Sequence, residues 1–134
     1  TQLTAAHGHL SFFGAYAMIV MAIISYAWPL LNGRQSSSPQ AQKVEIASIW
    51  MMSLSMLIIT LALTVAGAVQ IYFQRMPESG VALGYMATQD LLMPYYWVRL
   101  IAGCTFLLGV FMYLYSFVVA SRTIANAPLT PVKD

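Results

Sequence analysis

Three long stretches of mainly apolar residues dominate the chain and are separated by short polar segments. The stretches cover residues 3–31, 44–74 and 90–121. Each is longer than the roughly 20 residues that a helix needs to cross the hydrocarbon core of a bilayer. The pattern therefore predicts an all-α membrane protein with three transmembrane helices that form one continuous unit over residues 1–134.

The breaks between these stretches fall at residues that commonly end or begin helices. Pro29 and Gly33 close the first stretch. Asp90 is a suitable N-cap for the third stretch, and Pro94 would then lie in its first turn. The polar segments that remain are residues 32–43, residues 75–89 and a tail at residues 122–134.

Composition supports the membrane assignment and excludes several other classes. Of the 134 residues, 60% are hydrophobic and 7% are charged, whereas soluble domains carry about 25% charged residues. The net charge of +2 is spread along the whole chain, which is too dilute for a nucleic-acid interface. The single cysteine, Cys104, excludes an internal disulfide and a cysteine-based metal cluster.

The distribution of basic residues predicts the orientation in the membrane. Cytoplasmic loops are enriched in lysine and arginine. Segment 32–43 contains Arg34 and Lys43, and the tail contains Arg122 and Lys133, whereas segment 75–89 balances basic against acidic residues. We therefore expect the first loop and the tail to be cytoplasmic, and the loop over residues 75–89 to lie on the outer side of the membrane.

Two histidines lie together near the start of the first predicted helix, close to the outer face of the membrane. They are His7 and His9, separated by Gly8, and the chain contains no other histidine. Ionisable side chains within a membrane span are costly and often mark a functional site. Residues two apart on an α-helix point about 200° apart around its axis. The spacing therefore suits a helix placed between two prosthetic groups, with one imidazole offered to each.

On the residues alone, the pair has two further possible roles. Interfacial histidines can simply hydrogen-bond to water or lipid headgroups. A zinc or copper site is disfavoured, because the chain offers no third or fourth ligand beside the pair.

A few further polar residues occur within the predicted spans. Arg99 could extend to the interface or pair with a haem propionate, and the first role is favoured. Thr60, Thr64, Ser53 and Ser55 are expected to form hydrogen bonds within the helix bundle.

The histidine segment resembles a known family. Residues 2–16, QLTAAHGHLSFFGAY, resemble the tenth helix of the large subunit of cytochrome c-dependent nitric oxide reductases, which belong to the haem–copper oxidase superfamily. Residues 24–29, 74–77 and 86–90 are similar to the same family in the same order. The resemblance implies that the chain corresponds to the last three of twelve membrane helices.

The resemblance also implies a role for each histidine. His7 would be the proximal ligand of the high-spin haem b3, and His9 an axial ligand of the low-spin haem b. The family reduces two nitric oxide molecules to nitrous oxide and water with electrons from cytochrome c. Its expected partners are the remainder of the large subunit, a cytochrome c-type small subunit and the lipid bilayer.

The resemblance also indicates which parts of the site this chain lacks. The family's non-haem iron is held by residues on earlier helices, as is the second ligand of the low-spin haem. We therefore expect no catalytic residue here beyond the haem ligands, and no activity from this chain alone.

Three alternative functions are compatible with parts of the pattern. Within the superfamily they are a quinol-dependent nitric oxide reductase and an oxygen reductase, both disfavoured by the residues at and after the histidine pair. A three-helix membrane bundle without a cofactor is the alternative from another class.

Overall fold

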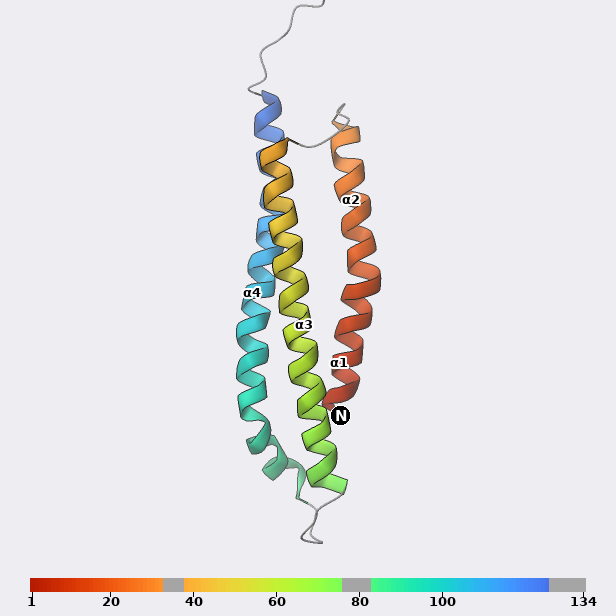
Figure 1. Cartoon of the computed structure of the whole chain (residues 1–134), viewed down its shortest axis with the longest axis vertical. Helices are drawn as coiled ribbons and strands as arrows, with labels where there is room; N and C mark the ends of the chain where they lie inside the picture. Colours follow the sequence, from red (N-terminus) through yellow and green to blue (C-terminus); the bar gives the residue numbers. More distant parts are fainter. Residues whose placement is uncertain (33–37, 76–82, 126–134) are drawn as a thin grey trace, which may run out of the picture.

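The chain folds into three long helical rods that run up, down and up beside one another (Figure 1). The structure is a computed structural model that describes residues 1–32, 38–75 and 83–125, with side chains as far as residue 119. Its elements are α1 (Gln2–Ser11), the π-helix η1 (Phe12–Ala17), α2 (Met18–Leu31), α3 (Pro39–Arg75) and α4 (Tyr85–Ala125). The consecutive elements α1, η1 and α2 form the first rod, α3 is the second rod and α4 is the third. The described residues form no strand, and the predicted all-α fold is confirmed.

All three rods are long and apolar enough to cross a membrane. The qualifying segments are Gln2–Leu31, Pro39–Arg75 and Tyr85–Val119. Many large apolar side chains point away from the other helices, including Ile23, Leu61 and Leu108. Such faces require lipid or further membrane helices around them.

The second rod begins earlier than the hydropathy pattern predicts. α3 starts at Pro39 rather than near residue 44. Proline suits the first helical position, because the N–H that it lacks would have no partner there. The Ser38 hydroxyl accepts a hydrogen bond from the Ala41 N–H at 3.3 Å and so caps this first turn. Three of the five added residues, Gln40, Gln42 and Lys43, are polar, so the added segment does not extend the apolar stretch.

The third rod also begins earlier, at Tyr85 instead of Asp90. Asp90 consequently lies within α4 and is not its N-cap, and Pro94 lies in the helix interior. A proline there removes one backbone hydrogen bond and bends the helix. Figure 1 shows α4 bent near its start. The first turn is held by buried Thr88, whose hydroxyl donates to the Gly84 carbonyl at 3.0 Å.

The most extensive contact in the bundle joins α3 and α4, and small residues make it close. A Cβ atom added at Gly109 of α4 would lie 2.6 Å from Met52 Cγ and 3.3 Å from the Ser48 carbonyl oxygen. Ser48 and Ser116 are also fully buried at this contact. Small residues bring backbones together and increase van der Waals packing, which is a main source of helix association in lipid.

The start of α1 rests directly on α3. A Cβ atom added at Gly67 would lie 2.6 Å from the backbone nitrogen of Leu3. Beside this contact, the Gln2 backbone N–H donates to Gln70 Oε1 at 3.2 Å, and the Gln2 side-chain amide donates to the Tyr96 hydroxyl at 2.9 Å. Three helices therefore meet at the N-terminal end of α1.

The other end of the first rod is held mainly by large side chains. The hydroxyl of buried Tyr113 on α4 hydrogen-bonds the Met21 carbonyl and the Ser25 hydroxyl, both at 2.9 Å. The rings of Trp28 and Phe117 pack with their centroids 5.1 Å apart. These contacts join α2 to α4.

We expect a Gly67→Ala substitution to displace α1 from α3 and to destabilise the protein. The added methyl group would overlap backbone atoms of Leu3, which cannot rotate away as a side chain can. Overpacking of this kind costs about 1–3 kcal/mol. The thermal unfolding midpoint of the detergent-solubilised protein should fall. Gly103→Ala is the matched control, because a Cβ there meets nothing within 4 Å. Equal midpoints for the two variants would contradict the close contact.

We expect Tyr113→Phe to weaken the attachment of α2 to α4. The variant keeps the ring but removes the hydroxyl that joins Ser25 and the Met21 carbonyl. Hydrogen bonds of this kind contribute about 0.5–1.5 kcal/mol each. Thermal unfolding and hydrogen exchange of the α2 amides would measure the effect. The exposed Tyr115 provides the control, since Tyr115→Phe should change neither. Unaltered α2 exchange in Tyr113→Phe would refute the role of this bond.

Candidate functional site

The two histidines lie on α1, four and six residues after Leu3, where that helix contacts Gly67 of α3. His7 is exposed within this chain and His9 is partly buried. A Cβ atom added at the intervening Gly8 would meet nothing within 4 Å. Packing within the described part of the chain therefore gives no reason for a glycine at this position. Its small size leaves room beside both imidazoles.

A backbone hydrogen bond selects the tautomer of the neutral His9 ring. Its Nδ1 lies 2.7 Å from the carbonyl oxygen of Ala5, one turn earlier on the same helix. A carbonyl oxygen only accepts hydrogen bonds, so Nδ1 carries the proton and donates it. The neutral ring then has its lone pair on Nε2. This arrangement is the usual one for a histidine that binds a metal through Nε2.

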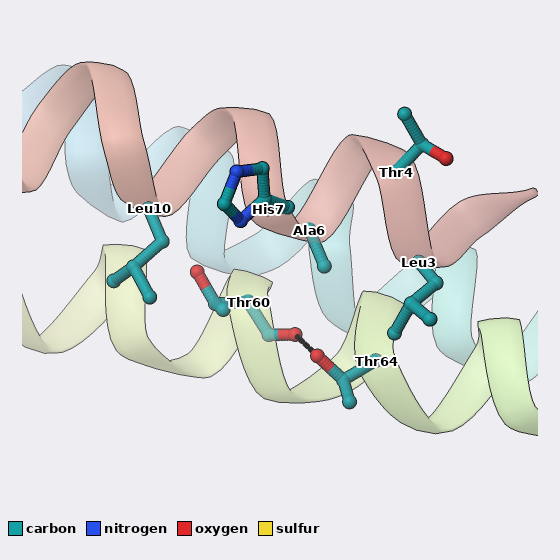
Figure 2. A pocket seen from close by; sticks show the side chains of 7 residues that line it. All are labelled: Leu3, Thr4, Ala6, His7, Leu10, Thr60 and Thr64. Atoms are coloured by element: carbon teal, nitrogen blue, oxygen red, sulfur yellow. Dashed lines mark hydrogen bonds between the residues drawn. The ribbon is translucent and has the colours of Figure 1, made fainter.

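His7 lines a hollow between α1 and α3 with a volume of about 540 Å³. We call this space the His7 hollow; it is lined by Leu3, Thr4, Ala6, His7, Leu10, Thr60 and Thr64. Figure 2 shows the imidazole reaching into it from α1, with the two α3 threonines on the opposite wall. The His7 Nε2 atom is 3.5 Å from the Ser11 hydroxyl, a distance at the weak limit of hydrogen bonding.

His9 lines a different hollow, of about 520 Å³. We call it the His9 hollow; it is lined by Ala5, Gly8, His9, Phe12, Phe13, Ala17, Met56 and Phe106. Apart from the imidazole, its walls are apolar and partly aromatic. The rings of Phe13 and Phe106 meet edge to face, with centroids 5.4 Å apart. The two hollows share no lining residue, so each histidine serves a separate space.

The π-helix η1 forms part of the wall beside His9. It follows α1 immediately and contributes Phe12, Phe13 and Ala17 to the His9 hollow. π-turns are rare and occur often at functional sites. Phe13 is buried whereas Phe12 is 70% exposed, so only one ring of this pair is enclosed by the chain.

The donor set fits haem better than a metal ion held by the protein alone. Among the described residues, no group of three or more His, Cys, Asp or Glu side chains could hold a metal ion. A haem needs only one or two axial ligands from the protein, because its macrocycle supplies the other donors. His7 and His9 each offer one imidazole, and the two side chains line separate hollows.

The remaining polar candidates lie in several different places. Arg99 is exposed on α4 and lines a further hollow with Tyr96 and Cys104, apart from both histidine hollows. Thr64 donates to the Thr60 carbonyl at 2.7 Å. The Thr60 hydroxyl is buried and has no hydrogen-bond partner within the described residues.

A polar network beside the histidines is not apparent from the sequence pattern. The Tyr96 hydroxyl donates to Gln89 Oε1 at 2.5 Å and accepts a hydrogen bond from the Gln2 side-chain amide at 2.9 Å. The buried Gln70 joins the same group through the Gln2 backbone. Polar residues at helix ends are common, so only the position of Gln70 within an apolar stretch could have indicated the network.

Comparison with known proteins identifies the family to which this helix arrangement belongs. Residues 1–105 match the family described as Cytochrome C and Quinol oxidase polypeptide I. Over 118 residues, the chain is 54% identical to a nitric oxide reductase subunit of Stutzerimonas stutzeri. That alignment covers 87% of this chain but 25% of the relative, so the chain spans about a quarter of its length. The resemblance inferred from the histidine segment is confirmed, and the chain belongs to the Cytochrome C and Quinol oxidase polypeptide I family of haem–copper oxidases.

Proposed function

We propose that this chain is the C-terminal part of the catalytic subunit of a nitric oxide reductase, and that it binds two haems. The observation that carries the proposal is that His7 and His9, two residues apart on α1, face two separate hollows. The 54% identity to a nitric oxide reductase subunit supports it. The three rods would be the last three helices of a twelve-helix bundle.

In this proposal each histidine holds a different haem. His7 is the proximal ligand of the high-spin haem b3, and His9 is an axial ligand of the low-spin haem b. The bond from His9 Nδ1 to the Ala5 carbonyl selects the neutral tautomer whose Nε2 lone pair can bind iron, and it fixes the orientation of the ring. Apart from the imidazole, the walls of the His9 hollow are apolar, which suits contact with a haem macrocycle. When bound, the haems supply redox-active iron for electron transfer and for the reduction of nitric oxide.

The complete reaction requires residues outside this chain. Two nitric oxide molecules, two electrons and two protons would yield nitrous oxide and water at the high-spin haem and a neighbouring non-haem iron. The described residues contain no group that could hold that iron, so its ligands would come from the remainder of the large protein. Glu45 and Asp90 lie within about two turns of the starts of α3 and α4, so the proton route would also depend on residues elsewhere.

The proposed location is the bacterial cytoplasmic membrane, with the histidines near the periplasmic side. The histidine end of α1, the end of α3 and the start of α4 lie at the same end of the bundle (Figure 1). The segment after α2 and the tail carry the basic excess that marks the cytoplasmic side. These two observations support the same orientation.

The electron donor in the proposal is cytochrome c, delivered through a cytochrome c-type small subunit. The similarity of residues 2–16 to cytochrome c-dependent enzymes supports this choice. A quinol-dependent nitric oxide reductase and an oxygen reductase are the alternatives within the family. Assays of the purified complex with each donor and each acceptor would separate the three.

We expect His9→Ala to remove the low-spin haem and His7→Ala to remove the high-spin haem from the purified complex. Each variant should lose one of the two haems and all nitric oxide reduction. Optical and electron paramagnetic resonance spectra distinguish the two spin states. Ser53→Ala, on the partly buried surface of α3, is the control and should retain both signals. A complex without a haem absorption band, or with spectra unchanged in both histidine variants, would instead favour a cofactor-free bundle.

We expect the isolated chain to be inactive even after reconstitution with haem. It supplies one proposed ligand to each haem, and its described residues supply no site for the non-haem iron. Nitric oxide consumption measured with an electrode should equal that of free haem with the same reductant. Catalytic consumption above that level would show that the remaining helices are not required.

A further inference from the structure

The Thr60 hydroxyl is a buried polar group without a hydrogen-bond partner among the described residues. Its Oγ1 atom is inaccessible to solvent and forms no hydrogen bond within the described part of the chain. Buried hydroxyls in native proteins nearly always have a partner, so an exception needs a physical reason. A threonine hydroxyl within a helix usually donates to a carbonyl one turn earlier. Thr64 and Thr105 form such bonds, with the carbonyls of Thr60 and Ile101.

The position of this hydroxyl relates it to His7. Thr60 lies on α3 and lines the His7 hollow, across from the imidazole. Figure 2 shows the two side chains facing the same space from opposite helices, while the Thr60 carbonyl is occupied by Thr64. Of the two threonine hydroxyls on this wall, only that of Thr60 is unused.

His7 in turn lacks the support that His9 has. His9 Nδ1 donates to the carbonyl of Ala5, but within residues 1–32, 38–75 and 83–125 no corresponding bond is made by His7 Nδ1. The one polar contact of the His7 ring with these residues is between Nε2 and Ser11, at 3.5 Å. An imidazole that binds metal through Nε2 carries its proton on Nδ1, and that N–H almost always has an acceptor.

We propose that the Thr60 hydroxyl is the acceptor for the Nδ1–H of His7 when His7 Nε2 binds the haem iron. Thr60 is then a positioning residue, which fixes the ring and increases the basicity of the ligand. A hydroxyl has two acceptor lone pairs and one donor hydrogen, so it can accept this bond and still donate another. The inference rests on the proposed function, because it requires His7 to be a haem ligand.

The test compares three variants of the complete, haem-loaded complex. Thr60→Val keeps the shape of the side chain but removes the hydroxyl, and Thr60→Ser keeps the hydroxyl. Thr64→Val is the matched control, since that hydroxyl already has a partner on its own helix. The readout is the iron–histidine stretching frequency of the ferrous high-spin haem, measured by resonance Raman spectroscopy.

We expect Thr60→Val to lower this frequency, because a neutral imidazole without an acceptor at Nδ1 forms a weaker bond to iron. The iron–histidine stretching frequency should be unchanged in both Thr60→Ser and Thr64→Val. Haem retention or activity in Thr60→Val should fall by roughly 10–100-fold, the usual effect of removing such a partner. If Thr60→Val does not assemble, Thr60→Asn replaces it, and its stronger amide acceptor should raise the frequency above that of Thr60→Ser.

An unchanged frequency in Thr60→Val, or an equal shift in Thr64→Val, would overturn the inference. If Thr60→Asn is used instead, equal frequencies in Thr60→Asn and Thr60→Ser would do the same. His7→Ala separates this result from a failure of the proposed function. If the iron–histidine band survives in His7→Ala, His7 is not the ligand and the proposed function fails. If the band is lost there but is insensitive to Thr60, only the role of Thr60 is wrong.

Discussion

The contact between the Leu3 backbone and Gly67 determines where the first rod leaves the surface of α3. No side chain larger than hydrogen fits at residue 67, because an added Cβ would lie 2.6 Å from the Leu3 nitrogen. His7 lies about one turn beyond this contact, and His9 follows two residues later. The positions of both imidazoles relative to α3 and α4 therefore depend on a backbone contact, which is stiffer than contacts between flexible side chains.

The same contact also accounts for the two different spaces that the histidines face. With α1 held against α3 at its start, the separation of about 200° between the two side chains places His7 on one side of the helix and His9 on the other. The His7 hollow contains threonine hydroxyls, whereas the His9 hollow is apolar and aromatic. The two imidazoles therefore have different surroundings although they are neighbours in sequence. Different surroundings are one of the means by which a protein tunes haem irons differently.

The sequence was sufficient for the features that depend on local pattern. Hydropathy located the three rods, and the spacing of His7 and His9 placed them on opposite faces. The start of α4 was misplaced, because Asp90 and Pro94 resemble a helix start while Thr88 forms the actual first turn with Gly84. The role of Gln70 depends on contacts between distant segments. The unpartnered state of Thr60 likewise depends on what surrounds it in the folded chain.

The π-helix η1 has a consequence for how the two halves of the first rod relate to each other. A π-turn holds one residue more than an α-turn, which is what a single-residue insertion into an α-helix would produce. If an inserted residue were not accommodated in a π-turn, it would rotate the rest of the helix by about 100° about its axis. The π-helix at Phe12–Ala17 thus sets the rotation of α2 relative to α1 about the helix axis. With this rotation, α1 directs His7 and His9 toward the two hollows while α2 faces Tyr113 of α4. Loss of one residue from this segment would rotate α2 by about 100° relative to the two histidines.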